Sequence, residues 1–325
     1  MLKDTYLSVS RSPELPDRIE GDGLLVGWSM EQDHMKRPIG FSFGDSLSRK
    51  SPHLIDPILF DGEGHLITIA ATGSGKGIGC IVPALLTHPG PAIVIDPKGE
   101  NAAVTRRYRE ETLGQKVFVL DPMGVVDGQS ARLNPLDLVD PADRNCVDEA
   151  ASIAELLSVH FKGDSKNQYW YSRGCHLLVA MILNAAASAD RTERSLAGIR
   201  EHLSLGSTEE GEYLHNLLKG SPHPAAREAA GAFSMAAKET LSSIISMGQD
   251  MVDFVRGDPV REATSDSDID LDAISRGEPI TIYIVLPPHM LESHAPLLRL
   301  WVGTLLRAIM RRRYRTPQPT LFLLD

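Results

Sequence analysis

A lysine follows two closely spaced glycines early in the chain, and this combination can bind phosphate groups. Gly73, Gly75 and Lys76 lie in the stretch ATGSGKG at residues 71–77. Glycine lets a backbone curl around phosphate oxygens without a Cβ in the way. A lysine ammonium reaches the outer phosphates as a point charge. The spacing therefore indicates that the protein handles a nucleoside triphosphate.

The residues on either side of this turn predict a strand before it and a helix after it. Residues 66–69 (LITI) form a short apolar run with β-branched side chains, typical of a strand covered on both faces. Beyond the turn, apolar residues recur at three- and four-residue spacing, as on one face of a helix: Ile78, Ile81, Val82, Leu85 and Leu86. A helix N-terminus offers free N–H groups and a positive dipole end to an anion. We therefore expect the phosphates to bind to Thr72, Gly73, Ser74, Gly75, Lys76, Gly77 and Ile78.

The match to a phosphate-binding loop is incomplete. Ala70 occupies the position of the usual first glycine, and Gly77 stands where a serine or threonine usually offers its hydroxyl to magnesium. A chance glycine-rich turn is the alternative interpretation. The apolar run, the turn, the lysine and the amphipathic pattern nevertheless occur together, and this combination favours a nucleotide site.

Aspartates end three further apolar runs, at Asp96, Asp121 and Asp325. In an open α/β sheet, ligands bind at the edge formed by the carboxyl ends of the strands. We expect Asp325 to hold magnesium, directly or through water. Two interpretations of Asp96 have equal weight: contact to the magnesium from the second shell of ligands, or an Asp-Pro turn. For Asp121 the turn interpretation is favoured.

The spacing of the apolar runs predicts an α/β fold with a mostly parallel sheet. Strands are expected at 92–96, 117–121, 280–286 and 320–325, with room for helical crossovers. Helical patterns fill the interval between them, at 147–159, 169–187, 195–203 and 225–255. We expect four parts: a loop-rich lead-in (1–60), a nucleotide-binding domain in two parts (61–145 and 256–325), and an all-α insertion (146–255). A linker at 257–272 would lead back from the insertion.

The charge of the chain limits the kinds of partner it can attract. Lys plus Arg number 33 and Asp plus Glu 43, a net charge of −10, so any nucleic-acid contact must be local, for example inside a ring. Arg106, Arg107 and Arg109 are interpreted as part of a solvated helix face. No segment has the length and composition of a membrane span, and we expect a cytoplasmic chain.

Four ordered motifs resemble the coupling ATPases of conjugation and type IV secretion (TraG type). They are ATGSGKG at 71–77, IDPKGEN at 95–101, FVLDPMG at 118–124 and RLNPLDLV at 132–139. In that family a RecA-like P-loop NTPase domain carries an all-α domain as an insertion. The resemblance covers most of residues 60–325, and the family often has glycine at the position of Gly77.

The resemblance implies an ATP hydrolase that uses ATP and Mg²⁺, with Lys76 on the phosphates and Asp325 on the metal as catalytic residues. It implies a motor that recruits single-stranded DNA, a relaxase or an effector protein and drives it towards a secretion channel. It also implies a hexameric ring at the inner face of the bacterial plasma membrane. The family's water-activating glutamate would follow Asp325, so we expect the C-terminal part of the core to be truncated here. The alternative function is a nucleotide-gated docking module that does not turn over ATP.

Overall fold

The fold was analysed in a computed structural model of the chain. The structure describes residues 19, 21, 23–29, 56–62, 64–71, 73–159, 168–208, 211–234, 237–316 and 318–325. Most of the predicted lead-in (1–60), and Thr72 of the predicted phosphate loop, lie outside these ranges. Within the lead-in, β1 (Leu24–Ser29) and β2 (Asp56–Phe60) pair antiparallel.

Among the described residues, four parallel strands form the central sheet, in the order β4-β5-β3-β6. They are β3 (Ala92–Ile95), β4 (Lys116–Leu120), β5 (Ile280–Ile284) and β6 (Leu321–Leu324). Every residue of β5 is buried, as expected for a strand with both faces covered. The predicted parallel α/β sheet is therefore confirmed, and its four carboxyl ends lie at one edge.

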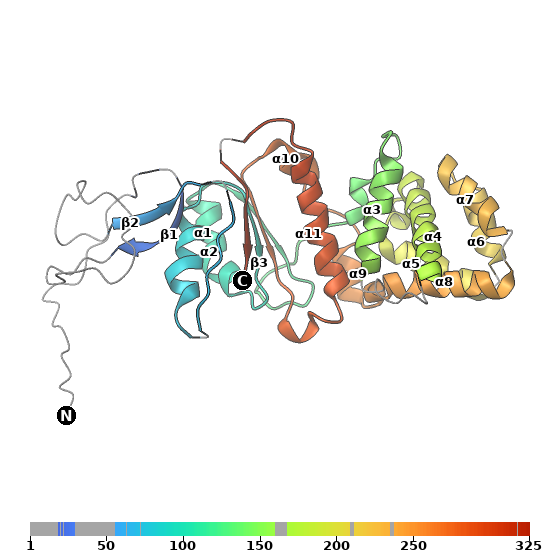
Figure 1. The fold of residues 1–325 in the computed structure, drawn as a ribbon, viewed down its shortest axis with the longest axis horizontal. Helices are drawn as coiled ribbons and strands as arrows, with labels where there is room; N and C mark the ends of the chain where they lie inside the picture. Colours follow the sequence, from blue (N-terminus) through green and yellow to red (C-terminus); the bar gives the residue numbers. More distant parts are fainter. Residues whose placement is uncertain are drawn as a thin grey trace, which may run out of the picture.

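Helices cover both faces of this sheet (Figure 1). On one face, α1 (Val82–Thr87) and α2 (Glu100–Glu111) pack on Ala92, Val94 and Tyr283. On the other face, α11 (Ala295–Met310) packs against Ile93 and Ile282 in the larger core. This alternation of strand side chains between two cores is the period of two that a β-strand imposes.

A group of helices extends from the α11 side of the sheet and gives the molecule its long axis (Figure 1). It comprises α3 (Cys146–Ser158), α4 (Gln168–Ala187), α5 (Leu196–Thr208), α6 (Glu212–Lys219), α7 (Pro224–Ser234) and α8 (Lys238–Val252). One continuous core joins these helices to α11 and the sheet. The boundaries at 146 and 255 that we predict for an insertion stay a proposal.

The segment expected to be a linker contains regular structure. It includes α9 (Asp258–Ala263) and the start of α10 (Leu271–Arg276), and α9 buries Val260 and Ala263. The apolar side chains of α9 are too few to give a helical period, although Pro259 in its first turn is a helix-start signal. Short 3-10 turns complete the fold: Pro135–Leu138, Arg191–Glu193, Asp253–Arg256 and Pro288–Met290.

The strand predicted at residues 66–69 is not formed. Residues 65–71 have no regular secondary structure, and the side chains of Ile67 and Ile69 are 85% and 88% exposed. A strand takes its backbone hydrogen bonds from a neighbour, and no described strand pairs with this segment. The prediction of a buried strand before the phosphate loop is therefore wrong for this structure.

Candidate nucleotide-binding site

The glycine-rich loop has the backbone geometry that its sequence demands. Gly73 and Gly75 have φ values of +79° and +86°, in the left-handed region where other residues are strained. A Cβ at either position would meet nothing within 4 Å, so the backbone angle rather than crowding requires glycine here. Lys76 is exposed and directly precedes the first helical turn.

The helix after the loop begins with an unusual turn. Gly77–Ile81 form a π-helical turn, which leads into α1. Leu85 is fully buried in the small core, as predicted, but Ile78 is 83% exposed. Ile78 is therefore not in the core with Leu85, and it lies in the π turn that precedes α1.

The loop lies at one end of the helix that leads into α1, and the position of the other end indicates how this helix runs relative to the sheet. At the other end, His88 follows α1, and its Nε2 lies 3.1 Å from the carbonyl oxygen of Pro319, just before β6. The stretch Gly77–Thr87 spans about 16 Å at helical rise, and β3 spans about 13 Å. Lys76 therefore lies towards the end of the sheet where Asp96 and Asp325 follow their strands.

Asp96 and Asp325 are brought together by a residue that the sequence did not single out. The Nδ2 of Asn101 donates to Asp96 Oδ1 at 3.3 Å and to Asp325 Oδ2 at 3.1 Å. The second oxygen of Asp96 accepts the N–H of Ala102 at 2.8 Å, so Asp96 caps the start of α2. The position of Asp96 is thus compatible with both predicted roles, the Asp-Pro turn and the contact to magnesium from the second shell of ligands. Asp96 stabilises the turn into α2, and it lies next to Asp325, the predicted metal ligand.

Burial raises the pKa of Asp96 above its usual value, and the charge of Asp325 adds to the rise. The hydrogen bonds from Ala102 and Asn101 oppose it. Desolvation is the largest of these effects, because only 1% of Asp96 is exposed. A cation bound nearby would favour the ionised form of this carboxyl group.

The oxygen atoms at this edge suit Mg²⁺. This ion keeps several waters and is usually held by one or two carboxylates together with substrate phosphates. Asp325 is exposed, and the hydrogen bond that its side chain accepts from Asn101 uses Oδ2. Across the described residues there is no cluster of three or more histidine, cysteine, aspartate or glutamate side chains suited to a metal ion. A two-carboxylate site that is completed by phosphate and water fits this arrangement.

Asp121 supports a turn, as the sequence analysis favours. Its Oδ2 accepts the N–H of Val126 at 2.6 Å, and its carbonyl oxygen accepts the N–H of Gly124 at 3.2 Å. It follows β4, which is separated from β3 by β5. Asp121 therefore lies apart from the Asp96–Asp325 pair along the sheet.

Arg109 is buried, contrary to the prediction of a solvated helix face. Its guanidinium donates to the carbonyl oxygens of Leu85, His88 and Gly90, which carry the end of α1 and the turn into β3. It also donates to the side chains of Gln115 and Thr281. Residues 106–111 read as a charged run, but position 109 faces the sheet, because it lies on the same face as the buried Ala102 and Thr105.

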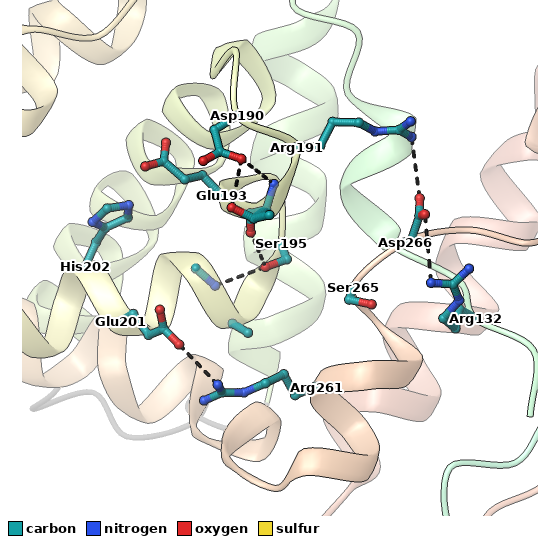
Figure 2. Close-up of a pocket in the computed structure, with 13 residues that line it drawn as sticks. Arg132, Asp190, Arg191, Glu193, Ser195, Glu201, His202, Arg261, Ser265 and Asp266 are labelled. Carbon is teal, nitrogen blue, oxygen red and sulfur yellow. Dashed lines mark hydrogen bonds and ion pairs between the residues drawn. The ribbon is translucent and has the colours of Figure 1, made fainter.

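A polar cavity of about 700 Å³ lies apart from these residues, between the start of α5 and the segment around α9 (Figure 2). Its arginines are paired with acids: Arg261 with Glu201 at 3.2 Å, and Arg191 with Asp266 at 3.5 Å. Arg132 of the RLNPLDLV motif binds Asp268 at 2.7 Å. These pairs offset the positive charge of the arginines, and two of them connect residues 191–201 to α9 and the segment after it.

Comparisons with known proteins decide the family. A model for the family "Type IV secretory system Conjugative DNA transfer" matches residues 30–325. The chain belongs to this family. Within the described ranges of this member, no helix combines the length and apolar character that crossing a bilayer requires.

Curated relatives agree with this assignment. The type IV secretion system-coupling protein VirD4 of Bartonella quintana is 26% identical over 270 residues, 81% of this chain and 42% of the relative. A conjugal transfer protein TraG of Escherichia coli is 28% identical over 257 residues, 77% of this chain and 40% of the relative. The chain thus spans about two fifths of the length of these relatives.

Solved structures of the plasmid coupling protein TrwB share the fold. The complex of TrwB with the ATP analogue ADPNP has a TM-score of 0.55 at 16% identity, covering 78% of this chain and 55% of that chain. The complex with ADP and Mg²⁺ gives the same values. This likeness confirms the predicted α/β, RecA-like P-loop fold.

Proposed function

We propose that this chain is a nucleotide-binding part of a type IV coupling protein, and that it binds ATP with Mg²⁺ at the carboxyl edge of its sheet. One observation carries the proposal: Asn101 joins Asp96 and Asp325 at the carboxyl edge of the sheet, while the helix that follows the glycine-rich loop ends near Pro319, before β6. TrwB, which has the same fold, forms complexes with an ATP analogue and with ADP and Mg²⁺.

The residues of the chain would divide the binding between them. The N–H groups of residues 73–78 and the ammonium of Lys76 would hold the phosphates, with Thr72 as a further contact. Asp325 would hold the metal directly or through water, and Asp96 would contact the metal from the second shell of ligands. When bound, Mg²⁺ neutralises charge that develops on the transferred phosphoryl group. Lys76 and Asp325 are the catalytic residues in this proposal.

In the whole protein, we propose that ATP hydrolysis drives single-stranded DNA, or a relaxase or effector protein, towards a type IV secretion channel. The protein would work as a hexameric ring at the inner face of the bacterial plasma membrane. With a net charge of −10, the chain has no bulk positive field, so contacts to DNA would come from local basic residues.

Calorimetric titration with ADP, with and without MgCl₂, tests the nucleotide site. We expect Mg²⁺ to tighten binding, and Asp325→Asn to remove most of that gain while binding without Mg²⁺ persists. Asp272→Asn, at an exposed position on α10, is the matched control and keeps the gain. Binding that is indifferent to Mg²⁺ in the unmodified chain would count against the proposed metal role.

Phosphate release separates the motor from the alternative, a nucleotide-gated docking module. A motor releases phosphate continuously from ATP, and Lys76→Ala abolishes the release in the full-length protein. Tight ATP binding without phosphate release by the full-length protein would favour the docking module instead.

A further inference from the structure

Asn101 is the only described residue whose side chain bonds both strand-end carboxylates. It belongs to the first turn of α2, and 3% of it is exposed. One nitrogen, Nδ2, donates to Asp96 after β3 and to Asp325 after β6, two residues that are 229 positions apart in the chain. An amide nitrogen carries two hydrogens, so it can supply one to each carboxylate.

The backbone of Asn101 is fixed from the opposite side. Its carbonyl oxygen accepts the hydroxyl of Thr105 at 2.7 Å. Thr105 Oγ1 in turn lies 2.6 Å from the hydroxyl of Tyr283, which is fully buried on β5. Because Thr105 uses its hydrogen on Asn101, Tyr283 must donate to Thr105. The amide group thus bonds the residues that follow β3 and β6, and the backbone of Asn101 is linked to β5 through Thr105.

We propose that Asn101 is a positioning residue that orients the Asp325 carboxylate for Mg²⁺. This inference rests on the proposed nucleotide site. β6 lies at the edge of the described sheet, and the backbone of Asp325 is held by one hydrogen bond from its N–H to Ile95 at 3.2 Å. The Asn101 amide occupies Oδ2 of Asp325 and leaves Oδ1 for the metal or its water.

The amide also reduces the repulsion between the two carboxylates when no metal is bound. Two like charges on adjacent strands repel each other, and a shared donor between them offsets part of that repulsion. A carboxylate at position 101 would lack the donor and add a third negative charge. Asn101 therefore holds the Asp325 carboxylate in one orientation before Mg²⁺ arrives.

Asn101→Leu tests the proposal, because leucine has nearly the same shape and no donor. We measure the affinity of the chain for a fluorescent ADP analogue at zero Mg²⁺, and the Mg²⁺ concentration that gives half of the Mg²⁺-dependent gain. We expect unchanged affinity without Mg²⁺ and an increase of about tenfold in the half-maximal Mg²⁺ concentration, since hydrogen bonds to charged groups are strong. Mn²⁺ binding followed by electron paramagnetic resonance gives a second readout, and it should weaken by a similar factor.

Thr105→Val is the matched control for packing. It removes the hydroxyl that joins Asn101 to Tyr283 but keeps the amide between the two carboxylates. If Asn101 acts only on stability, both variants lower the thermal midpoint and neither changes the Mg²⁺ requirement. A Mg²⁺ requirement in Asn101→Leu equal to that of the unmodified chain would overturn the inference. No nucleotide binding by the unmodified chain would overturn the proposed function, and the inference with it.

Discussion

Replacement of Arg109 by methionine should destabilise the fold strongly. Methionine keeps the apolar stem of the side chain but removes every donor. The Leu85 carbonyl then loses its partner, because position 89, four residues later, is a proline without an N–H. The carbonyl of His88 also loses the guanidinium, at 3.2 Å.

The size of the effect follows from these orphaned groups. Each buried acceptor left without a partner costs about 1–3 kcal/mol. The Gly90 carbonyl and the Gln115 side chain keep other partners, so they add little. Burial lowers the pKa of Arg109, which means that the charged form is costly in this position, and its removal offsets part of the loss. We expect a net loss of about 3–4 kcal/mol in the free energy of unfolding.

Urea unfolding of the unmodified chain and the variant, followed by tryptophan fluorescence, measures this loss. Arg107→Met is the matched control on the same helix. The Arg107 side chain is 82% exposed and pairs with Glu111 at 3.0 Å, so its loss should cost no more than about 0.5 kcal/mol. A destabilisation by Arg109→Met below about 1 kcal/mol, or equal to that of the control, would refute the argument from orphaned acceptors.

Two further predictions concern the loop and the dependence on pH. Gly73→Ala should weaken ADP binding by about five- to thirtyfold, because a non-glycine residue at φ +79° costs about 1–2 kcal/mol. The control Gly79→Ala should leave ADP binding unchanged. Equal ADP affinities of the two variants in calorimetry would contradict this prediction. Burial, with the charge of Arg109, lowers the pKa of His88, so the unfolded chain takes up the proton first as the pH falls below 6.5. The contribution of neutral His88 to the free energy of unfolding is therefore fully present above pH 6.5, and it is lost between pH 6.5 and the lowered pKa. His88→Gln should flatten this part of the profile of unfolding free energy against pH, measured from pH 7 to 5. A profile of unchanged slope in this variant would show that other groups carry the acid sensitivity.

The sequence predicted the parts of the fold that continuous apolar runs specify. The predicted strands at 92–96, 117–121, 280–286 and 320–325 have such runs, and the structure forms β3, β4, β5 and β6 there. The similar run at 66–69 is exposed, because apolar character alone does not supply a partner strand. The charged run around Arg109 predicted an exposed side chain, but Arg109 is buried. Its burial depends on backbone carbonyls from α1, and no local sequence pattern indicates that contact.

The candidate site was predictable only in pieces. The glycines and Lys76 follow a spacing rule, and Asp96 and Asp325 follow apolar runs, so each has a local signal. Asn101 has none, because its role depends on a contact to Asp325 that is 224 residues away in the chain. Contacts of that separation require the order of the strands in the sheet, which the sequence pattern leaves open.

The most direct test of the account is equilibrium binding of ATP, in MgCl₂, to the unmodified chain and to Lys76→Ala. Lys116→Ala serves as control, because Lys116 is the first residue of β4, at the amino end of that strand, and pairs with Glu278 at 3.2 Å. The account predicts that ATP binds the unmodified chain and Lys116→Ala equally well. Lys76→Ala should bind about ten- to a hundredfold more weakly, since a charged contact to phosphate is worth about 1.5–3 kcal/mol. Equal ATP affinity in all three proteins would contradict the central claim that this loop holds the nucleotide.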